Sequence, residues 1–261
     1  MGAQQHQSDP RILDRRTLQK DHRILAGMLA PGMSVLDVGC GTGAITKGIA
    51  EAVGRDGTVV GVDRDKVHVE RARALSQLLP NLSFEEGDAT SLGFEQHFDI
   101  VTSARTLQWI ADVPGAIFRM TRAAKPAGSI IVLDYNHSLN RWEPDPPAEF
   151  AAFYDAFLGW RRSNGWDNEI GNRLPELFTA AGLIDIQTHS QDETSEFGDQ
   201  DFEEKSGLWT AVIDNVASAL QESGFCNAAV VKDVYEAWRK QTLMKQTLSM
   251  KAVVARVPRG S

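Results

Sequence analysis

A glycine-rich segment near the start of the chain has residue types that suit binding of a nucleotide-like ligand. It follows the apolar run Ser34–Val38, precedes a helical pattern that begins near Ala44, and contains Gly39, Gly41 and Gly43. Glycines permit a tight turn and let a ligand approach bare backbone, while the first amides of the following helix favour an anionic group. The segment therefore predicts a ligand-binding turn between a strand and a helix.

Two acidic residues end later apolar runs. Asp63 follows Thr58–Val62 and lies 20 residues after Gly43, at the place where a carboxylate accepts hydrogen bonds from ribose hydroxyls. Asp88 ends the next run, Leu82–Glu86 with Gly87. At the carboxyl edge of a parallel sheet both carboxylates would face a ligand. The structural alternatives are a solvent-facing turn residue for Asp63 and a helix cap for Asp88.

The glycines also admit a second interpretation, the dinucleotide fingerprint G-x-G-x-x-A of dehydrogenases, formed by Gly39, Gly41 and Ala44. Asp37 argues against it, because a carboxylate inside the preceding strand would repel a pyrophosphate but could hold an ammonium group. No second glycine fingerprint follows in the sequence. We therefore favour a ligand with an ammonium group over a nicotinamide dinucleotide.

Strand-like and helix-like segments alternate through the first half of the chain and must position these residues. Such alternation indicates βαβ units, so we predict the α/β class with a doubly wound parallel sheet. The predicted strands are Ser34–Val38, Thr58–Val62, Leu82–Glu86, Phe98–Ser103 and Ser129–Tyr135, and helices are expected after residue 44 and at about 66–79 and 113–124.

The remaining segments predict helical additions to this sheet. Apolar spacing favours one N-terminal helix over residues 10–30 and helical structure over 199–247. We expect four parts: an N-terminal helical cap at 1–30, a core at 31–190, a helical insertion or lid at 191–248, and a last core strand at 249–257.

Composition and charge narrow the function classes. The 261 residues are 42% apolar, which fits one large core with an insertion better than two full domains. A net charge of −8 argues against a general binder of nucleic acid or of anionic membranes. The two cysteines, Cys40 and Cys226, are too few for a disulfide framework or a multi-cysteine zinc site. We expect a reduced, cytoplasmic protein without a metal or a membrane span.

Four segments together resemble class I S-adenosylmethionine-dependent methyltransferases, most of all the ubiquinone and menaquinone biosynthesis group. They are VLDVGCGTG at 35–43, VVGVD at 59–63, EGDAT at 86–90 and FDIVTSARTLQWIAD at 98–112. The segment Leu107–Trp109 is also similar to trans-aconitate methyltransferase. The resemblance covers about residues 33–135 and implies S-adenosylmethionine as cofactor and S-adenosylhomocysteine as its product. It does not specify the acceptor.

The resemblance also implies roles for individual residues around the methionine part of the cofactor. Gly39, Cys40 and Gly41 would line this part, and Asp37 would lie near its amino group. The backbone of Ser103–Arg105 would pass close to the methionine tail.

On the nucleoside side, the resemblance implies that Asp63 holds the ribose hydroxyls and that Asp88 and Ala89 meet the adenine. Arg64 departs from the family, which often has an apolar residue under the adenine at this place.

The family fold has a seven-stranded sheet with an antiparallel last strand. Leu183–Thr188 and Met250–Val257 suit its final hairpin, and the roughly 60 residues between them are interpreted as a helical insertion near the active site. With the N-terminal helix, this insertion could form a lid that excludes water.

Methyl transfer mainly requires alignment of a nucleophile with the activated methyl group, and such positioning can supply about 7–11 kcal/mol. A hydroxyl or protonated amine also needs a general base. The candidates near the end of the fifth strand are Asp134, Tyr135 and His137, for which ordinary packing or loop roles are the alternatives.

The acceptor pocket is predicted around Gln108, Trp109 and Trp142, with Arg105 as a residue that could hold an acid. Gln108 and Trp109 stand where many relatives have two histidines, so a histidine has no role there. We predict methyl transfer to a small, partly apolar molecule at an O, N, C or S atom. The alternatives are a carboxyl methyltransferase of the trans-aconitate type and a non-catalytic cofactor-binding module.

Overall fold

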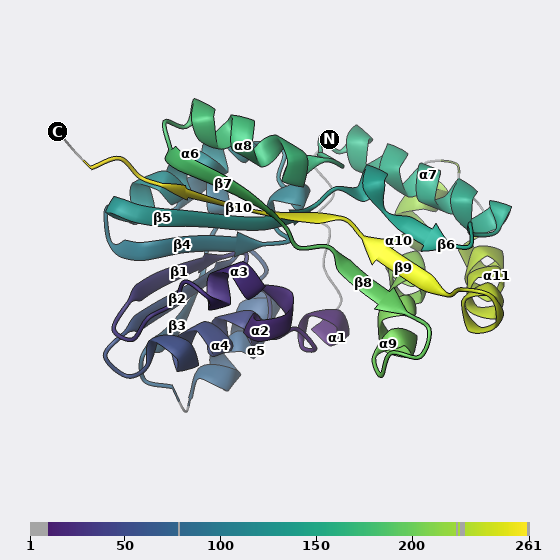
Figure 1. Cartoon of the computed structure of the whole chain (residues 1–261), viewed down its shortest axis with the longest axis horizontal. Helices are drawn as coiled ribbons and strands as arrows, with labels where there is room; N and C mark the ends of the chain where they lie inside the picture. Colours follow the sequence, from purple (N-terminus) through teal and green to yellow (C-terminus); the bar gives the residue numbers. More distant parts are fainter. Residues whose placement is uncertain (1–9, 78, 223, 225–227, 260–261) are drawn as a thin grey trace.

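The computed structural model describes residues 10–259 except 78, 223 and 225–227, so Cys226 lies outside the described residues. Its main sheet has seven strands, and β10 runs antiparallel to both of its neighbours, β5 and β7 (Figure 1). This confirms the predicted doubly wound, mostly parallel sheet. The strand order is β3 (Leu82–Glu86), β2 (Thr58–Asp63), β1 (Ser34–Val38), β4 (Phe98–Ala104), β5 (Ala124–Tyr135), β10 (Met250–Arg256) and β7 (Ile184–Ser190).

Helices cover both faces of this sheet because its central strands are apolar on both sides. In β1, for example, the neighbouring residues Val35 and Leu36 are both fully buried but belong to different core clusters. Val35 packs with α4 (Ala44–Val53), and Leu36 packs in the cluster that contains α6 (Val113–Ala123) and α8 (Ile170–Ala180). A further helix, α5 (Lys66–Ser76), joins β2 to β3.

The N-terminal segment is not the single helix predicted over residues 10–30. It forms three four-residue helices, α1 (Pro10–Leu13), α2 (Leu18–Asp21) and α3 (Arg23–Ala26). Thr17 caps α2, and His22 separates α2 from α3 with φ −146° and ψ 58°. The His22 imidazole is buried and its Nε2 lies 2.9 Å from Thr102 Oγ1 on β4. Contact with the sheet therefore breaks the helix that local apolar spacing favours.

Between β5 and β7, and again between β7 and β10, the chain forms helices together with strands that the sequence did not reveal. Strand β9 pairs antiparallel with β8 and with β6, and the three make a second sheet. Figure 1 shows this sheet and its helices beyond the carboxyl ends of the parallel strands. The elements are β6 (Arg141–Glu143), α7 (Ala148–Ser163), β8 (Glu193–Glu196), α9 (Phe202–Ser206), α10 (Leu208–Glu222), α11 (Ala228–Gln241) and β9 (Lys245–Leu248).

Aromatic side chains join α7, α10, α11 and the second sheet into one core cluster. Trp142 of β6 contacts Phe150 edge to face at 5.3 Å between ring centroids, and Phe150 stacks on Tyr235 at 4.4 Å. The Trp142 indole donates to Gln246 Oε1 at 3.0 Å, so its polar atom is satisfied although the ring is buried. No helix in the described part of the chain is both long and apolar enough to span a membrane.

The buried His22 predicts acid-sensitive stability. Burial, followed by the charge of Arg105, lowers the pKa of His22 to about 3. Below about pH 6.5, His22 therefore binds a proton in the unfolded chain but not in the folded chain. The free energy of unfolding falls as the pH drops from about 6.5 towards 3. This residue contributes up to about 1.4 kcal/mol per pH unit in that window. Denaturant unfolding of His22→Gln should show a correspondingly weaker pH dependence.

As a control, His97→Gln replaces an exposed imidazole and should leave the pH dependence of the wild-type chain unchanged. Equal pH dependence in the wild type and His22→Gln would contradict the placement of a neutral His22 beneath the N-terminal segment.

Candidate active site

A cavity of about 1620 Å³ opens at the carboxyl edge of the parallel strands. Single ligands usually occupy roughly 300–1,000 Å³, so this volume has room for a cofactor and a second molecule. Most predicted site residues line it: Gly39, Gly41, Asp63, Arg64, Asp88, Ala89, Arg105, Gln108, Trp109, Tyr135 and His137. Five others are described but do not belong to its lining: Asp37, Cys40, Ser103, Asp134 and Trp142.

The glycine turn has a shape that other residues would disturb. Gly39 has φ +77°, and a Cβ atom at this position would collide with the side chain of Thr106. Gly41 has φ +55°, and its Cβ would lie 3.0 Å from Leu13 Cδ1 of α1. The turn is thus packed closely between Thr106 and the N-terminal segment, and Gly39 and Gly41 present backbone without a side chain to the cavity that they line.

Asp63 holds this turn through its carboxylate. Oδ2 accepts from the Gly41 amide at 2.8 Å, and Oδ1 accepts from the Asp65 amide at 2.9 Å. Each carboxylate oxygen has a second lone pair, so both can still accept a hydroxyl donor from the cavity. The position combines a fixed carboxylate with free acceptor capacity, as ribose recognition demands.

Asp88 caps a short helix, which is the structural role considered for it in the sequence analysis. Its Oδ1 accepts from Thr90 N at 2.7 Å and from Thr90 Oγ1 at 2.6 Å, at the start of the 3-10 turn Ala89–Ser91. Burial alone would raise the pKa of Asp88, but the Thr90 hydrogen bonds and the Arg64 charge lower it below its ordinary value. The charged carboxylate lines the same cavity as Asp63.

Asp37 lies beneath the turn rather than in the cavity wall. Its side chain is buried, and Oδ2 accepts from Thr46 Oγ1 at 2.7 Å. Burial, with a smaller contribution from the charge of Asp63, raises the pKa of Asp37 to about 6, although the Thr46 hydrogen bond lowers it. Asp37 therefore changes charge close to neutral pH. Burial likewise raises the pKa of the Cys40 thiol, which keeps it protonated.

At the other end of the cavity, a buried hydrogen-bond network orients His137. Asp134 accepts from the amides of Tyr135 at 2.9 Å and Gln108 at 3.1 Å, which positions Gln108. Gln108 Nε2 donates to Arg105 O at 3.0 Å, so its Oε1 is the acceptor for His137 Nε2 at 2.7 Å. Burial, followed by the Arg161 charge, lowers the pKa of His137 well below its usual value, and the imidazole is neutral.

The three residues predicted to be catalytic therefore lie in different surroundings. Tyr135 and His137 both line the cavity, and their rings stack at 5.0 Å between centroids. Burial raises the pKa of the Tyr135 hydroxyl. Asp134 is fully buried and acts on Gln108 and Tyr135 through hydrogen bonds. Ser103 is also buried, with its hydroxyl donating to Val38 O at 2.8 Å.

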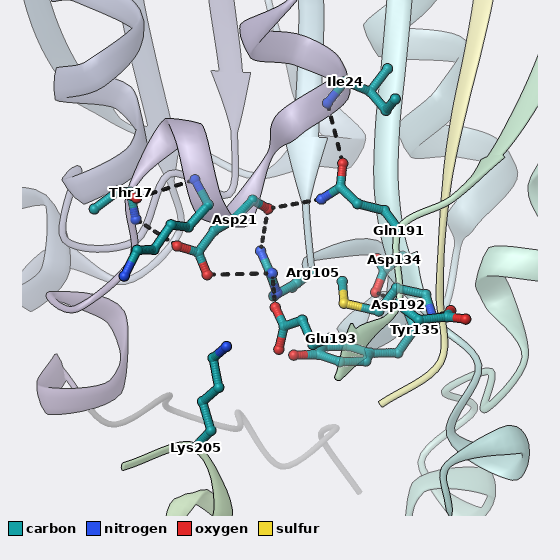
Figure 2. Close-up of polar contacts among 12 residues, drawn as sticks. Thr17, Asp21, Ile24, Arg105, Asp134, Tyr135, Gln191, Asp192, Glu193 and Lys205 are labelled. Atoms are coloured by element: carbon teal, nitrogen blue, oxygen red, sulfur yellow. Dashed lines mark hydrogen bonds and ion pairs between the residues drawn. The ribbon is translucent and has the colours of Figure 1, made fainter. Parts of the chain in front are cut away.

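Arg105 connects three distant parts of the chain instead of pointing freely into the cavity (Figure 2). Its Nη1 donates to Asp21 O at 3.0 Å, while Nη2 forms ion pairs with Glu193 and, at 3.6 Å, with Asp21 Oδ1. Gln191 strengthens the junction by accepting from Ile24 N at 3.2 Å and donating to Asp21 O at 3.3 Å. Sequence reasoning missed Asp21 and Glu193, because no local pattern marks residues that meet only in the folded chain.

The opposite wall of the cavity is apolar and aromatic. Trp109 and Trp209 of α10 line it, whereas Trp142 packs inside the aromatic cluster. Arg161 covers Trp109, with its guanidinium carbon 4.3 Å from the ring centroid. The apolar side chains of this wall include Trp109, Phe157, Trp166, Leu208, Trp209, Val212, Val216 and Leu248. The described residues include no cluster of His, Cys, Asp or Glu side chains that could hold a metal ion.

Residues 29–182 match the family model described as "Methyltransferase domain". A 2-phytyl-1,4-naphtoquinone methyltransferase of Thermosynechococcus vestitus is 36% identical over 110 residues, which cover 42% of this chain and about half (49%) of that protein. A demethylmenaquinone methyltransferase of Shouchella clausii is 30% identical over 174 residues, or 61% of this chain and 74% of that protein.

The fold is also similar to that of a solved phosphoethanolamine N-methyltransferase 2 of Haemonchus contortus, which contains S-adenosylhomocysteine. The TM-score is 0.58 at 18% identity, over 92% of this chain and 52% of that one. The family match spans the glycine turn, both acidic strand ends and strands β1 to β5. This protein is an enzyme that belongs to the class I S-adenosylmethionine-dependent methyltransferases.

Proposed function

We propose that this methyltransferase acts on a small, partly apolar molecule held between the cofactor and the aromatic wall. The observation that carries the proposal is the single cavity that contains the glycine turn at one end and the apolar side chains of α7 and α10 at the other. The acceptor atom is an O, N, C or S of that molecule. The two quinone-methylating relatives support an acceptor with a large apolar part.

The proposed cofactor contacts follow the strand ends. Gly39 and Gly41 offer backbone to the methionine part, and Asp37 attracts its ammonium group from beneath the turn. Asp63 accepts from the ribose hydroxyls.

Asp88 and Ala89 meet the adenine, with Arg64 beside it. Cys40 and Ser103 support the turn and β4 from positions outside the cavity lining.

The N-terminal cap and the insertion are proposed to act together as a lid. Arg15 of the cap forms an ion pair with Glu204 of α9 at 3.5 Å, which supports a cover made from both segments. Exclusion of water would strengthen the electrostatic interactions around the sulfonium. The division of the chain at residues 30, 190 and 248 stays a prediction, as does a cytoplasmic location.

For the chemical step, we propose in-line displacement with the neutral His137 or the Tyr135 hydroxyl nearest to the acceptor. Asp134 positions Gln108, which in turn fixes the His137 ring. The Arg105 guanidinium is paired with Glu193 and Asp21 and is not free to hold an acid, which argues against the carboxyl methyltransferase alternative.

A labelled-methyl assay tests the acceptor class. Radiolabelled S-adenosylmethionine should methylate members of a panel of naphthoquinols, phenols and aromatic acids, and should leave DNA, tRNA and mixed proteins unlabelled. Val212→Glu places a charge in the apolar wall and should abolish this turnover while S-adenosylhomocysteine still binds. Val230→Glu, on the exposed side of α11, is the matched control and should keep full activity. Labelling of a macromolecule in place of the small acceptors would refute the proposal.

Asp63→Ala should weaken binding of S-adenosylmethionine by about 1.5–3 kcal/mol, because charged hydrogen bonds to the ribose are lost. Isothermal titration calorimetry measures this difference. Asp56→Ala removes an exposed carboxylate in the turn before β2 and should bind the cofactor normally. If folded Asp63→Ala bound the cofactor with unchanged affinity, the ribose assignment would be wrong.

Cofactor affinity should depend on pH through Asp37. The proposed ion pair with the ammonium group needs the charged carboxylate, so affinity for S-adenosylhomocysteine should fall as the pH drops through about 6. Thr46→Val removes a hydrogen bond that favours the charged form, so the fall should begin at a higher pH. Asp37→Asn should bind weakly at pH 8 and show a flatter profile. A wild-type affinity that is constant between pH 5 and 8 would exclude this role.

A further inference from the structure

Arg161 of α7 is a fully buried cation behind the aromatic wall of the cavity, and the sequence analysis did not identify it. Its guanidinium carbon lies 4.3 Å from the ring centroid of Trp109 and 5.5 Å from that of Phe157, and both rings line the cavity. A guanidinium removed from water costs free energy, and an apolar residue of similar volume often serves a fold equally well. An arginine here is therefore expected to hold something that an apolar residue could not.

One hydrogen bond of Arg161 completes the fixation of Gln108. Arg161 Nη2 donates to the Gln108 carbonyl at 2.9 Å, while the Asp134 carboxylate accepts from the Gln108 amide at 3.1 Å. The Gln108 side chain donates from Nε2 to Arg105 O at 3.0 Å. Every polar group of Gln108 other than Oε1 is thus bonded, so Oε1 is left to accept from His137 Nε2 at 2.7 Å.

A second hydrogen bond of Arg161 reaches the backbone of His137 through Asn168. Arg161 Nε donates to Asn168 Oδ1 at 2.8 Å, and the Asn168 carbonyl accepts from the His137 amide at 2.7 Å. Asn168 Nδ2 donates to Leu158 O of α7 at 3.0 Å, which fixes the orientation of this side chain. One guanidinium therefore supports the His137 ring through Gln108 and the His137 backbone through Asn168.

This arrangement selects one protonation form of the His137 ring. Because Gln108 Oε1 can only accept, Nε2 carries the proton and Nδ1 keeps its lone pair. Nδ1 has no hydrogen-bond partner among the described residues, and His137 lines the cavity. Such a lone pair can take the proton that an acceptor hydroxyl loses as its oxygen bonds to the methyl carbon and the carbon–sulfur bond of the cofactor breaks.

We propose that Arg161 is a positioning residue for methyl transfer, whose bonds to Gln108 and Asn168 hold His137 as the Nε2–H tautomer with Nδ1 free. The inference rests on the proposed function and deepens it, because it selects His137 over Tyr135 as the group that takes a proton. Arg161 does not belong to the cavity lining, so it acts through these neighbours.

NMR spectroscopy of the whole chain with 15N-labelled histidine tests this role without an acceptor. In the wild type, His137 should give the signals of a single neutral Nε2–H tautomer, assigned by their loss in His137→Gln. Arg161→Met fills a similar volume without donors and should give a mixture of tautomers. Arg161→Lys keeps the charge but has only one nitrogen for the two oxygens, and should give an intermediate mixture.

The neighbouring exposed arginine of α7 provides the matched control. Arg162→Met should give the same His137 signals as the wild type. Turnover supplies a second readout with any molecule of the labelled-methyl panel that is methylated. For that molecule, Arg161→Met should lower kcat about tenfold or more, while the affinity for S-adenosylhomocysteine stays unchanged. If no molecule of the panel were methylated, the proposed function would fail, and the NMR result would still decide the role of Arg161.

The proposal would be overturned by a folded Arg161→Met that keeps either the wild-type tautomer or the wild-type kcat. A wild-type His137 that carries its proton on Nδ1 would overturn it as well. If Arg161→Met did not fold, wild-type signals in Arg161→Lys would have the same consequence. Failure of both variants to fold would show that Arg161 has a purely structural role.

Discussion

The buried guanidinium of Arg105 needs compensating partners, and the arrangement of the rest of the site depends on them. A charge removed from water is costly unless partners compensate it, and these partners come from two other parts of the chain. Asp21 lies in the N-terminal segment and Glu193 begins β8, so one side chain at the end of β4 ties both to the sheet. The N-terminal segment and β8 form walls of the cavity because this junction holds both of them against the sheet.

The aromatic cluster is the second constraint on the cavity. Helices α7, α10 and α11 bury their aromatic rings against each other and against the second sheet, beyond the carboxyl edge of the parallel strands (Figure 1). Edge-to-face and stacked ring contacts give this cluster a defined packing. Rings at its margin, such as Phe157 and Trp209, also line the cavity. The same residues thus stabilise the insertion and shape the space proposed for the acceptor.

The two ends of the cavity consequently differ in the interactions that form them. The end proposed for the cofactor is lined by Gly39, Gly41 and the carboxylates at strand ends, which the parallel sheet positions. At the end proposed for the acceptor, the carboxylate of Asp134 acts through Gln108 on the neutral His137. Charged side chains, among them Arg105, Glu193 and Lys205, also line the cavity, and the wall beside them is apolar and aromatic. This combination supports an acceptor that is apolar over most of its surface.

The sequence by itself determined the α/β class, the positions of strands β1 to β5 along the chain and the acidic strand ends, because these depend on local periodicity and on glycines with short-range roles. It did not reveal the kinked N-terminal segment, in which the contact of His22 with Thr102 overrides helix-forming apolar spacing. Nor did it reveal the second sheet, whose strand β9 pairs Trp142 with Gln246, 104 residues further along the chain. The tertiary structure alone decided that Arg105 is paired with Glu193 and that Arg161 bonds Gln108, since these partners meet only when distant segments pack.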